Sequence, residues 1–144
     1  MSKTYNQRCN IASTLDIIGD RWTLLIVREL FQGFSKFNEL KQALQGISPN
    51  ILSERLQFLE NEGIILSRLY SKHPPRFSYA LTDKGKELRH VLNALAIWGQ
   101  QHLDHPYSKV VHSKCEQEVG VTYYCPHCEM TSDDLRYVQV ERSD

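Results

Sequence analysis

Apolar residues in the first half of the chain recur at the spacing of an α-helix in four successive segments. These segments cover residues 11–18, 20–33, 36–44 and 49–62. Gly19 closes the first segment, and Asp20 provides an N-cap for the second. The second segment is apolar nearly all round, which is typical of a helix buried at the centre of a small domain.

The fourth segment has clear start and stop signals. Ser48 is a favourable N-cap, and Pro49 stands at the first helical position, where its missing N–H costs nothing. Gly63 provides the expected C-terminal stop. Leucines share one side of this helix and small polar residues the other. The leucine side consists of Leu52, Leu56 and Leu59, and the polar side of Asn50, Ser53, Glu54, Gln57 and Asn61.

After Gly63 the pattern changes to the alternation of β-strands. Residues 65–70 and 76–81 predict two strands, joined by Ser-Lys-His-Pro-Pro. This connection is too irregular to predict a tight two-residue hairpin. A single long helix is then expected over residues 82–103, capped by Thr82.

The predicted fold class is mainly α with a small β-hairpin wing (α+β). Two short helices, of which the second is capped and has a polar outer face, followed by a basic β-hairpin form a winged helix-turn-helix. We assign residues 1–105 to this DNA-binding and dimerisation domain. Residues 106–144 form a C-terminal His/Cys extension, for which the sequence predicts a small zinc-ribbon-like hairpin.

The composition favours a cytoplasmic protein without a membrane partner. The 144 residues are 41% hydrophobic and contain no run as long as a membrane span. The polar start, MSKTYNQRCN, lacks the apolar stretch of a signal peptide.

Charge is unevenly distributed although the net charge is zero. Residues 106–144 carry a net charge of −3, which leaves +3 on the rest of the chain. The segment from Gly63 to Thr82 contains no acidic residue, but it contains Arg68, Lys72 and Arg76. A basic edge of this kind favours a nucleic-acid partner.

We therefore interpret the polar helix side as a surface that reads double-stranded DNA. Amides can pair with adenine, hydroxyls can bind bases or phosphate, and basic side chains of the hairpin can bind phosphate or the minor groove. The predicted DNA-binding residues are Lys36, Ser48, Asn50, Ser53, Glu54, Gln57, Lys72, His73 and Arg76.

The alternative is that the polar side is an ordinary solvated helix surface. Few Lys–Glu pairs occupy it, which favours the DNA interpretation. Glu54 opposes that interpretation unless it accepts from cytosine or pairs with a neighbouring cation. Arg55 has the alternative role of pairing with an acid of the protein, such as Glu39.

Two pairs of potential metal ligands lie near the C-terminus. His112 and Cys115 are three residues apart, as are Cys125 and Cys128. Such pairs can complete a tetrahedral site, so we predict one structural zinc ion per chain. Residues 119–124 and 135–141 are the expected strands of the surrounding hairpin. A Cys125–Cys128 redox pair and an extension without metal are the alternatives.

Several segments closely resemble the HxlR-type transcriptional regulators, which are related to the MarR group. They are CNIASTLDIIGDRWTLLIVREL, FNELKQALQGISPNILSERLQFLENEGII, PPRFSYALTDKGKEL and LNALAIWGQQHL. The resemblance covers residues 9–103 and includes the Gly-x-x-Trp-Thr, Gly-Ile-Ser-Pro, Pro-Pro-Arg and Thr-Asp-x-Gly segments in order.

The resemblance implies a homodimer on an inverted-repeat operator, commonly a repressor, whose dimer surface comes from the N-terminal helix and the long C-terminal helix. Val91, Leu92, Leu95 and Trp98 form an apolar stripe on the latter. Packing of this stripe inside one chain, on Trp22 and Leu25, is the alternative.

The resemblance also draws attention to Cys9. In several relatives a cysteine at this place reacts with electrophiles or oxidants and changes DNA affinity. The nearby helix N-terminus and Arg8 favour the thiolate form. The alternative is a small buried side chain without a sensing role. Any small-molecule effector is unknown from the sequence.

Other functions are less consistent with the sequence. No glycine-rich phosphate loop, nucleophile elbow or paired acid–base set is present, so an enzyme is not expected. A winged-helix protein-interaction module and a metal-responsive regulator that uses the C-terminal cluster are the remaining alternatives.

Overall fold

The computed structural model describes residues 4–141. The chain forms two compact units, one ending at Leu92 and the other beginning at Asn93. This division lies inside the last long helix rather than at the predicted boundary of residue 105. Leu88 and Leu92 pack against the core of the first unit, which explains why the start of that helix belongs to it. The roles assigned to residues 1–105 and 106–144 stay predictions.

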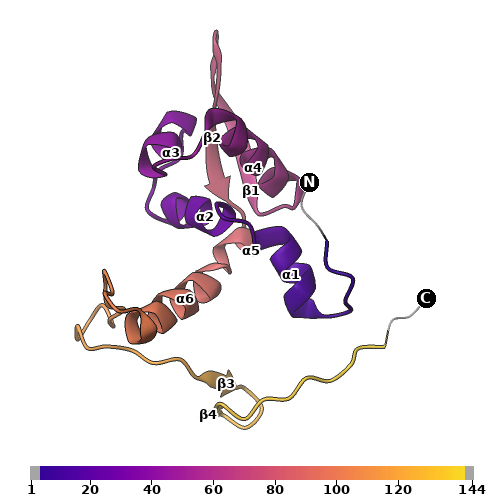
Figure 1. Cartoon of the computed structure of the whole chain (residues 1–144), viewed down its shortest axis with the longest axis vertical. Coiled ribbons are helices and arrows are strands. Elements are labelled where there is room, and N and C mark those ends of the chain that lie inside the picture. Colours follow the sequence, from indigo (N-terminus) through magenta and orange to yellow (C-terminus); the bar gives the residue numbers. More distant parts are fainter. Residues whose placement is uncertain (1–3, 142–144) are drawn as a thin grey trace. The chain divides into compact units, whose positions relative to one another are not determined.

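The first unit combines short helices with one β-hairpin (Figure 1). Its elements are α1 (Asn10–Ile18), α2 (Thr23–Phe31), α3 (Phe37–Ala43), α4 (Pro49–Asn61), β1 (Ile65–Lys72), β2 (Pro75–Leu81), α5 (Asp83–Lys86) and the start of α6 (Arg89–His102). The helix boundaries of α1 to α4 confirm the four helical patterns. The mixed α and β-hairpin fold of a winged helix is therefore confirmed.

The core of this unit lies between α2, α3, α4 and the start of the hairpin. Leu52, Leu56 and Leu59 of α4 are almost completely buried, as their spacing predicts. They pack with Ile26 of α2 and Leu40 of α3. Each fully buried side chain of this size contributes roughly 1.5–3 kcal/mol relative to exposure. Burial of one side of α4 fixes the direction of its other side.

The hairpin is tighter than the sequence suggests. β1 and β2 are antiparallel from Ile65↔Leu81 to Lys72↔Pro75, with a register shift between Leu69 and Ser71. Only His73 and Pro74 connect the strands, so the prediction that excluded a two-residue turn is wrong. The His73–Pro74 peptide bond is cis.

The predicted long helix after the hairpin is two helices, α5 and α6, with the break at Glu87 and Leu88. The predicted cap is confirmed, since the Thr82 side chain accepts a hydrogen bond from the Gly85 N–H at 3.1 Å. Gly85 is buried where a Cβ would overlap the carbonyl oxygen of Ile64. This close approach places α5 directly against the start of β1.

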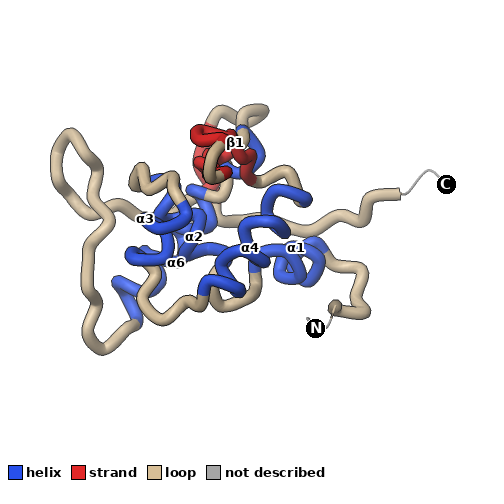
Figure 2. The backbone as a smooth tube through the Cα atoms, turned by 90° about the horizontal axis from the view of Figure 1, so that it is seen from above, coloured by secondary structure: helices blue, strands red, loops and turns tan. Residues whose placement is uncertain are grey.

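The second unit contains the rest of α6 and a segment that is mostly loop (Figure 2). Two short antiparallel strands, β3 (Tyr123–Cys125) and β4 (Met130–Ser132), pair from Tyr123↔Ser132 to Cys125↔Met130. Residues 135–141 were expected to be the partner strand and are not, because the chain reverses at once after Cys125 and Met130 pairs with it instead.

No helix within residues 4–141 is long and apolar enough to cross a lipid bilayer.

Candidate nucleic-acid interface

The polar side of α4 is open to solvent, opposite its buried leucines. Asn50, Ser53, Glu54 and Gln57 are all exposed. Since the leucines fix the rotation of α4 about its axis, these four side chains form one continuous outer face. The amide and hydroxyl groups predicted to read DNA are therefore accessible.

The N-terminus of α4 has few backbone donors for a ligand. The Ser48 side chain accepts from the Ile51 N–H at 3.2 Å, and Pro49 has no N–H. In the first turn of α4, the Asn50 N–H therefore has no capping partner among the described residues, and it is directed outward. The Ser48 hydroxyl still has its own hydrogen to donate to a phosphate.

Two polar side chains of α4 already interact with neighbours. The Gln57 amide donates to Asn61 Oδ1 at 3.1 Å, one helical turn further on. Glu54 lies 3.5 Å from Arg55, at the limit of a hydrogen bond, and its side chain stays 73% exposed. Glu54 is thus weakly neutralised, and Gln57 must exchange Asn61 for a base in order to read DNA.

Arg55 has a different partner from the acid suggested by the sequence. Its guanidinium lies 3.3 Å from the Asp20 carboxylate and 4.6 Å from the centre of the Phe58 ring. Glu39 instead accepts from the backbone N–H groups of Ser35 and Lys36, which precede α3. Arg55 is thus a structural residue that joins α4 to the start of α2.

Asp20 begins α2 by accepting hydrogen bonds from the backbone N–H groups of Trp22 and Thr23, at 3.0 and 3.1 Å. The Thr23 hydroxyl also donates to it. Burial by itself raises the pKa of Asp20, but these hydrogen bonds and the Arg55 charge outweigh burial and lower the pKa overall. Asp20 is therefore a carboxylate at neutral pH.

A second contact joins α4 to the hairpin. Glu60 accepts from the Ser67 hydroxyl at 2.6 Å and from its backbone N–H at 3.2 Å. Burial and the neighbouring Glu60 charge both raise the pKa of Tyr79 on β2. Through these contacts the hairpin holds a fixed position relative to the outer face of α4.

Three of the four basic residues of the hairpin, counting His73, lie at or next to its tip, and Arg68 lies in the middle of β1. Lys72, His73 and Arg76 are all exposed, and the tip extends beyond the helices (Figure 1). No acidic side chain occurs in either strand or in the turn. The tip is therefore available to a polyanion such as the DNA backbone.

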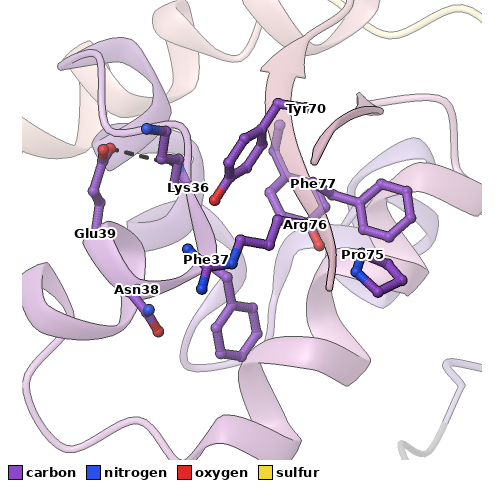
Figure 3. A pocket seen from close by; sticks show the side chains of 9 residues that line it. Lys36, Phe37, Asn38, Glu39, Tyr70, Pro75, Arg76 and Phe77 are labelled. Atoms are coloured by element: carbon purple, nitrogen blue, oxygen red, sulfur yellow. Dashed lines mark hydrogen bonds between the residues drawn. The ribbon is translucent and has the colours of Figure 1, made fainter. Parts of the chain in front are cut away.

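The hairpin and the start of α3 enclose an open groove of about 540 Å³. Figure 3 shows Tyr70 and Arg76 reaching toward α3, whereas Phe77 points away. The Lys36 ammonium lies 5.0 Å from the centre of the Tyr70 ring. The Tyr79 N–H donates to the Ser35 carbonyl at 2.7 Å, which attaches β2 to the residues before α3. Lys36 and Arg76 are thus brought to one groove.

Sequence reasoning missed Tyr70 as part of this surface. Tyr70 was read as an ordinary strand residue, but it is 47% exposed and holds the Lys36 side chain. Its position next to the register shift at Leu69 and Ser71 separates it from the regular alternation of the strand. The presence of Tyr70 in a segment with basic but no acidic residues is the sequence feature that could have indicated its role.

The sequence model of HxlR-like helix-turn-helix proteins matches residues 17–107, which is more than half of the chain. The chain belongs to the HxlR-like helix-turn-helix family. Members named by the comparisons are transcriptional regulators of the helix-turn-helix type, so this HxlR-family protein is a transcriptional regulator rather than an enzyme. The resemblance found in the sequence is confirmed.

Relatives align over most of this regulator. The helix-turn-helix transcriptional regulator Rv3095 of Mycobacterium tuberculosis is 35% identical over 122 residues, which cover 83% of this chain and 77% of Rv3095. PA1607, a candidate transcription factor of known structure, is 30% identical, with a TM-score of 0.74 over 94% of this chain and 97% of its own. The redox regulator HypR in its oxidised form is 30% identical, with a TM-score of 0.61 over 67% of this chain and all of HypR.

The predicted dimer residues differ in exposure. Leu92 packs against the core of the first unit and Val91 is half-buried. Leu95 and Trp98 are 54% and 62% exposed. The apolar stripe therefore contributes to the core at its start and stays open to solvent further along.

Cys9 is exposed and forms the N-cap of α1 through its backbone, with its carbonyl accepting from the Ser13 N–H. Its thiol makes no capping hydrogen bond. The structure thus excludes the alternative of a buried Cys9. The role of Cys9 as a sensor stays a prediction.

The predicted metal ligands come together in pairs. His112 Nδ1 lies 3.3 Å from Cys115 Sγ, and the Cys128 N–H points to Cys125 Sγ at 3.4 Å. Backbone hydrogen bonds from Cys128 and His127 lower the pKa of the Cys125 thiol. Among residues 4–141, no three His, Cys, Asp or Glu side chains meet as ligands of one ion. The four-ligand zinc site stays a prediction.

Proposed function

We propose that this regulator acts as a homodimer on an inverted-repeat operator, with α4 of each protomer in the major groove. One observation carries the proposal: the amide and hydroxyl face of α4 is exposed beside a hairpin that contains basic but no acidic residues. A helix reads base edges in the major groove, and flanking basic groups fix its position through phosphates.

Each predicted residue has a role in this complex. Asn50 and Gln57 pair with base edges, while the hydroxyls of Ser48 and Ser53 donate to bases or phosphate. Glu54 accepts from the amino group of a cytosine, which removes the conflict between its charge and the phosphates. Lys36 and Arg76 bind one phosphate group at the groove between α3 and the hairpin, and Lys72 and His73 bind beyond it.

Two apolar surfaces support the homodimer. Ile11 and Leu15 lie one helical turn apart on α1 and are 56% and 42% exposed. Leu95 and Trp98 are exposed on α6. A second copy of the chain would cover both surfaces. A symmetric pair of α4 helices then requires half-sites about 34–36 Å apart, which is one turn of DNA.

We also infer that the regulator represses transcription and that a chemical signal relieves this repression. A dimer that occupies an operator overlapping a promoter blocks transcription without further contacts, so we infer repression. Oxidants or electrophiles modify Cys9, and this modification relieves repression. The exposed thiol at the start of α1 supports this response, as does the likeness to the redox regulator HypR.

The experiment is a footprint on the protein's own promoter, followed by a salt titration of affinity for the protected DNA. We expect a protected inverted repeat, and binding that weakens steeply as salt rises. A protein-interaction module would protect no sequence. Binding that is the same at low and high salt would also contradict the proposal, because phosphate contacts release counterions.

A further inference from the structure

The two ligand pairs in the second unit share one backbone geometry. In the first pair, the Glu116 N–H donates to the His112 carbonyl at 2.8 Å, which folds residues 112–116 into a tight turn. This turn places His112 Nδ1 and Cys115 Sγ 3.3 Å apart. Both ligand atoms are therefore directed to the same side of the turn.

The second pair also lies on a tight turn. The chain turns back between Cys125 and Met130, which pair across β3 and β4. The Cys128 N–H donates to Cys125 Sγ at 3.4 Å, so the sulfur atom lies over the turn. A metal-bound thiolate commonly accepts such backbone hydrogen bonds, which orient it toward the ion.

The residue after each pair has an unusual backbone conformation. Glu116 and Glu129 have φ values of +59° and +54°, and they are the non-glycine residues with positive φ between residues 4 and 141. This left-handed conformation is unfavourable for glutamate. Its occurrence directly after Cys115 and directly after Cys128 indicates that both turns are shaped for the same purpose.

Little else in this segment would hold the two turns together. Tyr123, Tyr124 and Met130 on the short strands are all more than half exposed. A segment without a core of its own needs a crosslink or a metal ion to become ordered. No disulfide crosslink joins the described cysteines, all of which are free thiols.

From these two ligand pairs we propose a closed Zn²⁺ site in which His112, Cys115, Cys125 and Cys128 bind one ion per chain. One nitrogen and three sulfur ligands in a tetrahedron suit zinc, and a site with four protein ligands is structural. Each turn supplies half of the site, and zinc draws the halves together. Residues 116–124 between them span up to about 30 Å when extended, so they allow this approach.

His127 offers a matched control because it lies inside the second turn, next to a proposed ligand. Adjacent residues on a tight turn direct their side chains differently, so His127 does not join the site. His127→Ala and Cys9→Ser should each bind zinc as the unchanged protein does. His112→Ala, Cys115→Ser, Cys125→Ser and Cys128→Ser should each bind it far more weakly.

The experiment uses tag-free full-length protein, reduced and stripped of metal, titrated with Zn²⁺ in competition with a chromophoric chelator. We expect about one tight equivalent per chain. Co²⁺ in place of Zn²⁺ should give the strong visible bands of a tetrahedral site and thiolate-to-cobalt charge transfer in the near ultraviolet.

Three results would overturn the proposal. The first is the absence of tight zinc binding by the unchanged, reduced protein, which does not depend on how any variant folds. The second is loss of zinc from His127→Ala with retention in His112→Ala. The third is a Co²⁺ spectrum without charge transfer. DNA binding measured beside these tests reports on the first unit, so the zinc site can fail without affecting the proposed regulator.

Discussion

The guanidinium of Arg55 on α4 lies 3.3 Å from the carboxylate of Asp20, the residue that caps the start of α2. One carboxylate thus serves as the cap of a buried helix and as the anchor of the helix proposed to read DNA. Because the same carboxylate has both roles, protonation of Asp20 in acid should weaken the start of α2 and the attachment of α4 together.

Asp20 should make the protein less stable in acid. Its folded pKa is lowered, so its contribution is complete above the unfolded pKa of about 3.9 and is lost as pH falls through the folded pKa. Asp20→Asn removes the charge that pairs with Arg55 and should lower the free energy of unfolding by roughly 0.2–1 kcal/mol at pH 7. Urea unfolding between pH 7 and pH 2.5 should show a shallower acid decline for Asp20→Asn. Equal declines would contradict the role of the charge.

Gln57 should contribute to recognition of specific bases. Gln57→Ala should weaken binding to the footprinted operator by roughly 1–3 kcal/mol and leave binding to unrelated DNA nearly unchanged. Asn50→Ala should act in the same way. Fluorescence anisotropy with labelled duplexes measures both affinities. Gln42→Ala on the exposed surface of α3 is the control, and unchanged operator affinity in both α4 variants would show that α4 is not in the groove.

Arg76 should bind phosphate without reading sequence. Arg76→Ala should weaken binding to operator and unrelated DNA alike, and it should reduce the slope of log affinity against log salt by about 1. Arg89→Ala, at the exposed start of α6, provides a control of equal charge. A loss confined to the operator would instead indicate base contact.

Gly85 should tolerate no side chain. In Gly85→Ala the added Cβ overlaps the Ile64 carbonyl oxygen, and backbone must shift, at a cost of roughly 1–3 kcal/mol. Gly99→Ala is the matched control, because its Cβ meets the movable end of Leu103 at 3.3 Å and alanine favours the helix. Thermal unfolding should separate the two variants. Similar melting temperatures would show that α5 can move away from β1.

Trp98 should hold the dimer together. Trp98→Glu places a charge in the proposed apolar interface and should raise the dimer dissociation constant at least tenfold, as measured by sedimentation equilibrium. Operator affinity should fall with it, since a monomer contacts one half-site. Gln101→Ala, exposed on the same helix, should leave both unchanged. A dimer of unaltered strength would place the interface elsewhere.

Most of the first unit could be predicted because its helices carry their signals locally. The Ser48 and Thr82 caps, the leucines of α4 and the stop at Gly63 each act within a few residues, and all are confirmed. The exposed side of α4 follows directly, since burial of one face determines the other.

The incorrect predictions concern features that depend on contacts between residues far apart in the sequence or on uncommon backbone conformations. The break between α5 and α6 accompanies the packing of Gly85 on Ile64, more than twenty residues away. The two-residue turn uses a cis proline, which the residue order does not reveal. The choice of Asp20 over Glu39 as partner of Arg55 depends on which acid lies beside α4 in the folded chain, and the linear sequence does not show this.

The hydrogen bonds from Ser67 to Glu60 and from Tyr79 to Ser35 attach the hairpin to α4 and to the residues that precede α3. In the proposed homodimer, a signal that releases DNA would therefore change the distance between the two α4 helices rather than the arrangement of α4 and the hairpin within one protomer.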